Sequence, residues 1–120
     1  MKRLSYLLIS FVLTVTLFNS CTPEITVFDK SLLTGVWVSG TEYYRYDSDG
    51  NGVTWDTSDN VTEATGQKFT WTLINSELTQ NHILEIGGTV PKTYTLTELT
   101  TTTLKYKDDF GVAYSFTKVN

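Results

Sequence analysis

Apolar and polar residues alternate along most of the chain after residue 34, with the period of two that is typical of β-strands. The clearest case is the stretch 67–73, where Phe69, Trp71 and Leu73 alternate with polar residues and so face one side of a strand. The same pattern predicts eight strands, at 35–41, 42–46, 53–56, 67–73, 78–86, 92–99, 103–107 and 112–119. Short, evenly spaced strands favour an antiparallel meander that closes as a small barrel, with a sandwich as the alternative. The predicted fold class is therefore all-β.

Turn residues separate these strands. The segment 47–52 is rich in Asp, Asn and Gly, the polar stretch 57–66 is the longest irregular piece, and Gly87 and Gly88 interrupt the fifth strand. Pro91 is expected where a strand begins rather than inside one, because proline has no backbone N–H to donate. Only one helical turn is predicted, just before the first strand, with Asp29 as its N-cap.

The first twenty residues have the order of a secretory signal. Lys2 and Arg3 precede an apolar run from Tyr6 to Phe18, which is too short to favour a permanent transmembrane helix. Ser20 then stands directly before Cys21, the only cysteine of the chain. This divides the chain into a signal peptide at 1–20, a tether at 21–32 and a barrel domain at 33–120.

The stretch from Phe18 to Cys21 resembles the lipobox of bacterial lipoproteins. The resemblance implies that Cys21 is acylated and becomes the new N-terminus, and several acyl chains on one cysteine anchor a protein firmly. Thr22, directly after the cysteine, resembles outer-membrane sorting in that family, so the implied location is the envelope of a Gram-negative bacterium. The alternative is an ordinary signal peptide followed by a chance cysteine.

Charge excludes some classes of partner. Without Lys2 and Arg3, seven basic residues face thirteen acidic ones, a formal charge of −6. Nucleic acids and anionic membrane surfaces both require a basic patch, and the sequence has no basic cluster. We therefore expect no nucleic-acid partner, and contact with a membrane only through the N-terminal lipid.

Several short motifs resemble small bacterial lipocalin-like lipoproteins, whose domain is a calycin-type barrel. They are Gly35-Val36-Trp37 at the first strand, 43–52 around the first long turn, Phe69-Thr70-Trp71, and 114–118 in the last strand. The resemblance implies that Trp37 plugs the closed end of a barrel and that Gly35 allows the chain to turn tightly into the first strand. It also implies that Lys118 packs over Trp37 in a cation–π contact.

Aromatic side chains are dense for so short a domain, with 13% Phe, Trp and Tyr. They have two interpretations: they line a pocket for an apolar or ring-bearing ligand, or they fill the barrel, because eight strands enclose little more than side chains. The candidate lining residues are Tyr44, Trp55, Phe69, Trp71, Tyr94, Tyr106, Tyr114 and Phe116.

Other candidate chemistry is sparse. Asp47, Asp49 and Asn51 match the first half of a calcium loop, but the same residues suit a tight hairpin turn, which we favour. His82 is the only histidine and is expected to be structural, because neither a catalytic triad nor a zinc site can be assembled around it. The sequence therefore predicts no enzyme activity, no metal and no cofactor.

Two functions fit these observations. The first is reversible, non-catalytic binding of a small hydrophobic or amphipathic molecule, with the open end of the barrel framed by the 57–66 loop and the Gly87-Gly88 turn. The second is a structural or interaction module, in which a side-chain-filled barrel docks onto an envelope protein assembly. The sequence does not identify the ligand or the protein partner.

Overall fold

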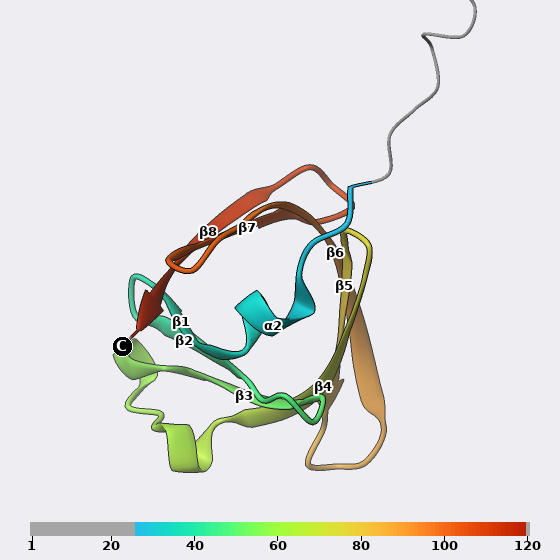
Figure 1. Ribbon diagram of the computed structural model, residues 1–120. Coiled ribbons are helices and arrows are strands. Elements are labelled where there is room, and N and C mark those ends of the chain that lie inside the picture. The colour runs from blue at the N-terminus through green and yellow to red at the C-terminus, as the bar shows by residue number, and fades with distance from the viewer. Residues whose placement is uncertain (1–25, 120) are drawn as a thin grey trace, which may run out of the picture.

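The computed structural model describes residues 26–119, which form a closed antiparallel barrel of eight strands (Figure 1). Consecutive strands are neighbours throughout, and the last strand returns to pair with the first. The strands are β1 Gly35–Ser39, β2 Glu42–Tyr46, β3 Asn51–Asp56, β4 Gln67–Ile74, β5 Glu77–Ile83, β6 Thr89–Leu99, β7 Thr103–Lys107 and β8 Ala113–Val119. The predicted all-β meander, closed as a barrel, is confirmed.

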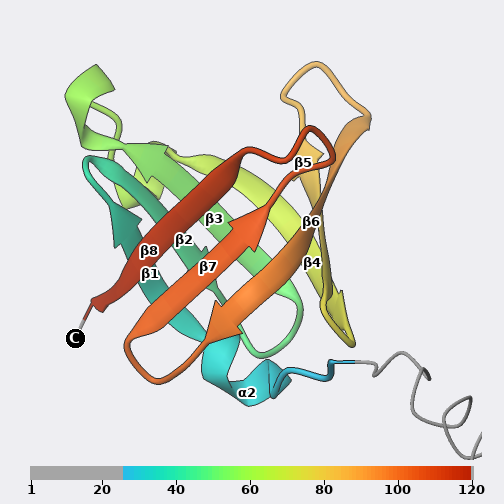
Figure 2. The same ribbon diagram turned by 90° about the horizontal axis from the view of Figure 1, so that it is seen from above.

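A single α-helical turn, α2 Lys30–Leu33, lies across one end of the barrel (Figures 1 and 2). Asp29 is its N-cap, as predicted, and its carboxylate accepts a hydrogen bond from the Ser31 backbone N–H at 3.0 Å. Leu33 is completely buried, and Phe28 packs against the same core. This turn therefore forms the floor of the barrel.

The opposite end carries the longer connections (Figure 2). The 57–66 loop contains two 3-10 turns, η1 Thr57–Asp59 and η2 Glu63–Thr65, and the β5–β6 connection contains Gly87 and Gly88, both with positive φ. These two segments rise above the barrel wall on either side of the open end. Both segments that were expected to frame the open end therefore lie at the end opposite α2 (Figure 2).

Trp37 is the centre of the floor. Its ring is fully buried, and its indole N–H donates to the Leu33 carbonyl oxygen at 2.8 Å. The Lys118 Nζ lies 4.5 Å from the ring centroid and donates hydrogen bonds to the carbonyl oxygens of Leu32 and Thr34. Lys118 also pairs with Trp37 across the β1–β8 seam. The contact implied by the resemblance is present, and it lies where the barrel closes.

Six strands differ from their predicted bounds, and the two largest differences, of three residues, are in β5 and β6. β5 ends at Ile83, three residues earlier than predicted, and β6 begins at Thr89, so that Pro91 lies inside a strand. Only every second residue of β6 forms backbone hydrogen bonds with β5. The N–H groups of Leu84 and Leu96 form bonds of this kind, and counting along the strand from them shows that the backbone nitrogen of Pro91 points away from β5. Proline is therefore tolerated at this position. On its other side, β7 pairs with β6 only from Thr95 onward, so no N–H is needed there.

Gly35 is required by its backbone and by its surroundings. Its φ is +128°, and a Cβ at this position would lie 2.6 Å from both Cε and Nζ of Lys118. Gly40, in the β1–β2 turn, also has a positive φ of +61°, but a Cβ added there would meet nothing within 4 Å. Both positions strain an L-residue, and only at Gly35 must Lys118 move as well.

We expect Gly40→Ala to lower the free energy of unfolding by about 1–2 kcal/mol, the backbone cost alone. Gly35→Ala should lower it further, because a φ of +128° is less accessible to alanine than +61° and because the displaced Lys118 loses a cation–π contact of roughly 0.5–1 kcal/mol. Urea unfolding followed by tryptophan fluorescence measures both. Equal losses in the two variants would contradict the role given to Lys118.

Candidate functional site

The interior of the barrel is filled by aromatic rings that touch one another. Tyr106 lies 5.2 Å from Phe116 and 4.4 Å from Tyr94, and Tyr44 lies 5.5 Å from Phe116, measured between ring centroids. Edge-to-face and tilted geometries dominate, which are the favourable ones for aromatic pairs. Seven of the eight predicted lining residues are brought together here: Tyr44, Phe69, Trp71, Tyr94, Tyr106, Tyr114 and Phe116.

Trp55 is the exception. It pairs with Tyr43 across β2 and β3, one position away from the inward-facing Tyr44, so it lies on the outer wall. There its ring stacks on Tyr43 with a centroid distance of 5.2 Å and an interplanar angle of 6°. The prediction that Trp55 lines the interior is wrong, because the inward positions of β3 are Gly52 and Thr54.

A hydrogen-bonded row of polar side chains crosses this aromatic interior. This row was not predicted from the sequence. Gln80 is fully buried; its amide N–H donates to the Tyr46 hydroxyl at 2.7 Å, and its amide oxygen lies 2.8 Å from Nε2 of His82. The other ring nitrogen, Nδ1, lies 3.0 Å from the side-chain amide of Gln67. The alternation Gln80–His82 in β5 was the available signal, because both share the inward face with Leu78.

His82 is held neutral by this setting. It is 2% exposed and stacks on Phe69 at 5.3 Å. Burial, reinforced by the positive charge of Lys92, lowers its pKa from 6.5 to about 4. The expectation of a structural histidine agrees with its partners, which are two amides and an aromatic ring.

Two tyrosines toward the end opposite α2, the buried Tyr44 and the more exposed Tyr114, are tied to carboxylates. The Tyr44 hydroxyl donates to Glu42 at 2.9 Å, and the Tyr114 hydroxyl donates to Asp108 at 3.3 Å. Burial, together with the negative charges of this region, raises the pKa of Tyr94 to about 12. These hydroxyls therefore remain protonated at neutral pH and act only as hydrogen-bond donors or acceptors.

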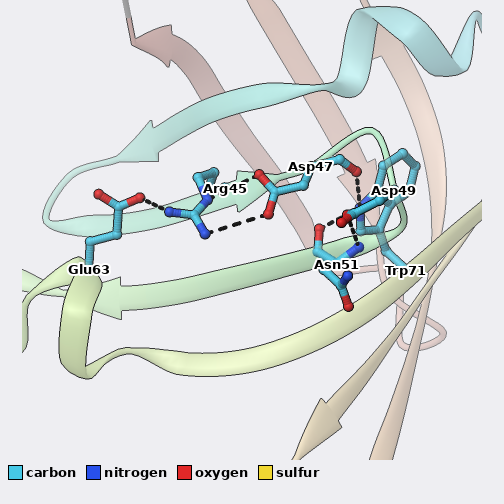
Figure 3. Close-up of polar contacts among 6 residues, drawn as sticks. All are labelled: Arg45, Asp47, Asp49, Asn51, Glu63 and Trp71. Atoms are coloured by element: carbon cyan, nitrogen blue, oxygen red, sulfur yellow. Dashed lines mark hydrogen bonds and ion pairs between the residues drawn. The ribbon is translucent and has the colours of Figure 1, made fainter.

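The 47–52 segment forms a tight turn whose oxygens are already engaged (Figure 3). The Asp47 carboxylate pairs with Nε of Arg45 at 3.2 Å, and the Asp49 carboxylate accepts the Asn51 backbone N–H at 3.0 Å. The indole N–H of Trp71 bonds to the carbonyl oxygens of Asp47 and Asn51. The three residues thus form the network of a hairpin turn, and no three His, Cys, Asp or Glu side chains within residues 26–119 gather as a metal site.

A groove lies on the outer wall of the barrel. A hollow of about 600 Å³ lies between the outer faces of β3 and β4 and the η2 turn, with Arg45, Val53 and Lys68 on the wall and Glu63 and Ala64 on the loop. A second hollow of about 460 Å³ continues toward Leu84 and Glu85 and shares Ala64, Gly66, Lys68 and Ile83 with the first. We call the two together the outer groove.

Two features of the backbone create the outer groove. The paired register of β4 and β5 ends at Phe69 and His82, so Gln67 and Lys68 separate from the chain beyond Ile83. Gly66 lets the loop approach the wall, since a Cβ there would lie 2.6 Å from the Thr54 carbonyl oxygen and 2.8 Å from Val53 Cγ2. The outward-facing Val53 is consequently only 5% exposed.

Arg45 links the groove wall to the loop. Its guanidinium lies between Asp47, near the end of its own strand, and Glu63 of η2, and it pairs with both carboxylates (Figure 3). Lys68 has no ion-pair partner among residues 26–119, where the three ion pairs involve Arg45 twice and Lys105 once.

No protein-family model, curated protein sequence or solved structure matches the chain. Within the described residues, no helix is both long enough and apolar enough to cross a membrane. The predicted signal peptide and the lipidation candidate Cys21 lie outside the described residues.

His82 is the only histidine, so no other histidine contributes to the change of stability with pH. The folded pKa lies below the unfolded value of 6.5, so the unfolded chain takes up the proton first as the pH falls. The stabilising contribution is complete above pH 6.5 and is lost as the pH falls toward 4. We expect the free energy of unfolding to drop by about 2 kcal/mol between about pH 7.5 and pH 5.

Urea unfolding at the two pH values measures this loss, and His82→Gln is the control. Glutamine keeps a polar group between Gln80 and Gln67 but does not titrate, so the variant should show little change over the same window. An equal loss in the variant would assign the pH dependence to other groups.

Proposed function

We propose that this protein is a lipid-anchored envelope protein of the lipocalin-like class that binds a small amphipathic molecule without chemical conversion. We further propose that the anchor is Cys21 and that the location is the outer membrane of a Gram-negative bacterium. The single observation that supports binding is the outer groove, whose first hollow has a volume within the range of small-molecule sites.

The rings that fill the barrel favour an external site over an internal one. Tyr46, Trp71 and Phe69 pack at centroid distances of 5.4–5.5 Å, and each is at most 2% exposed. An apolar ligand would have to displace several such contacts to enter. The outer groove instead combines the apolar surface of Ala64 and Ile83 with charged groups, which are Arg45, Lys68, Asp47 and Glu63.

A second candidate function is docking to an envelope protein assembly. The observation that favours it is on the outer wall of β1–β3, where Val38, Tyr43 and Trp55 form one row of direct cross-strand neighbours. The stacked Tyr43–Trp55 pair presents aromatic surface away from the core. On this view the filled barrel is a rigid support for that row.

The small-molecule proposal predicts that a bulky side chain placed in the outer groove weakens ligand binding. The chain from residue 22 contains α2 and all eight strands, so it carries the whole described domain. We expect a fluorescent fatty-acid analogue to bind it and Ala64→Phe to weaken binding by about tenfold or more, because a phenyl ring occupies the shared part of both hollows. Fluorescence titration measures the affinity.

The matched control is Ala113→Phe, the same change at an exposed alanine of β8 away from the outer groove. It should bind the analogue as the parent chain does. Unchanged binding by Ala64→Phe would exclude the groove as the site, and no binding by the parent chain would favour the docking function instead.

The anchor proposal predicts that Cys21→Ala releases the protein from the membrane fraction. Without the cysteine there is no sulfur to acylate, and a net charge of −6 after the signal segment gives no electrostatic attraction to anionic lipids. Fractionation of cells followed by immunoblotting measures this. Ser20→Ala, which keeps a small residue before the cysteine, is the control and should stay in the membrane fraction.

A further inference from the structure

The outer groove has a chemical polarity that selects among amphipathic ligands. Arg45 lies on its first hollow, Lys68 lines both hollows, and the carboxylate of Glu85 lies at the far end of the second. Between them Ile83, 43% exposed, and Ala64 supply apolar surface. Asp47 and Glu63 also line the first hollow, where both pair with Arg45, so Lys68 is the cation that no ion pair engages among residues 26–119. Its charge beside apolar surface suits a ligand with an anionic head.

Glu63 stands where such a head would bind. The Arg45 guanidinium already has one carboxylate partner, Asp47, from its own strand. Glu63 is a second partner, contributed by a loop, and its side chain is 47% exposed. Ion pairs this exposed contribute little to stability because water screens them, so an external carboxylate can replace Glu63 at small cost.

Replacement would also use a charge that the described structure leaves unpaired. Lys68 follows Gln67 at the start of β4, faces outward and lines both hollows, yet no carboxylate of residues 26–119 forms an ion pair with it. A carboxylate in the groove between Arg45 and Lys68 would gain two cationic partners, whereas Glu63 engages only one.

We propose that the outer groove binds an amphipathic carboxylate whose head lies between Arg45 and Lys68, and that Glu63 is an internal substitute for this head when no ligand is bound. The inference rests on the proposed function and specifies its ligand class. The apolar part of the ligand lies along Ala64 and Ile83, and Glu85 repels a head placed at the other end. Release of Glu63 frees the η2 turn from its ion pair with the barrel wall.

The test compares three probes of equal chain length on the chain from residue 22: dodecanoate, dodecanamide and dodecylamine, each measured by displacement of the fluorescent fatty-acid analogue. The parent chain should prefer dodecanoate over dodecanamide and bind dodecylamine least. Preference for dodecylamine would overturn the proposed anionic selectivity. Failure of all three probes to bind would instead overturn the proposed function itself, so the two failures are distinguishable.

Glu63→Gln tests the substitute role, because it keeps the shape of the side chain and removes its charge. We expect dodecanoate to bind about three- to fivefold more tightly to this variant, with dodecanamide unchanged. Glu77→Gln makes the same charge change at the start of β5, outside the groove, and should leave both affinities unchanged. Equal effects of the two variants on dodecanoate would overturn the role of Glu63.

Lys68→Met tests the second cationic partner and keeps most of the apolar stem. Dodecanoate should bind about fivefold more weakly to it, and dodecanamide as before. A parallel loss for both probes would mean that Lys68 contributes only packing and would overturn its part in head-group recognition. Cooperative urea unfolding of each variant confirms that the barrel is intact.

Discussion

The contact between Lys118 and Trp37 is the constraint on which the rest of the barrel depends. It joins the last strand to the first, which is the one pairing in this meander between strands that are not consecutive in the sequence. The ammonium has no carboxylate partner among residues 26–119; it is satisfied by the carbonyl oxygens of Leu32 and Thr34 and by the face of the indole ring. Burial lowers the pKa of Lys118, which is the cost of placing a cation at this seam.

The same contact determines its neighbours. The indole N–H of Trp37 binds the last residue of α2, so the helical turn is held across the barrel end by the ring that Lys118 covers. Gly35 is required by its φ of +128°, and the end of the Lys118 side chain lies where a Cβ would be. The floor, the seam and the glycine of the Gly–x–Trp motif therefore meet at one interaction.

Prediction from the sequence succeeded where structure follows from local pattern. Strand alternation gave eight strands, and Asp29 was identifiable as an N-cap because its carboxylate has only to reach two residues along the chain. Trp55 was misplaced because its aromatic character suggested the interior. Thr54 pairs with the inward-facing Tyr44, so the next residue, Trp55, faces outward. Pro91 was misplaced because its tolerance depends on where a non-adjacent segment, β7, stops pairing.

The outer groove could not be predicted for the same physical reason. Arg45 and Glu63 are eighteen residues apart, and the 57–66 loop has no periodicity that fixes its position on the wall. The loop position follows from the absence of a side chain at Gly66, and the opening beside it follows from the end of β4–β5 pairing at Phe69. Both are properties of the assembled barrel rather than of any one segment.

The proposed anchor gives the outer groove a direction relative to the membrane. Thr26, the first described residue, is five residues after Cys21, a span of at most about 18 Å. The α2 end of the barrel is therefore held close to the lipid, and the groove begins at that end, beside the turn that contains Asp47 and Asn51 (Figures 2 and 3). An amphipathic carboxylate leaving the membrane would meet Arg45 before it reached the open end. A filled barrel suits this arrangement, because binding along the wall requires a rigid surface and no internal cavity.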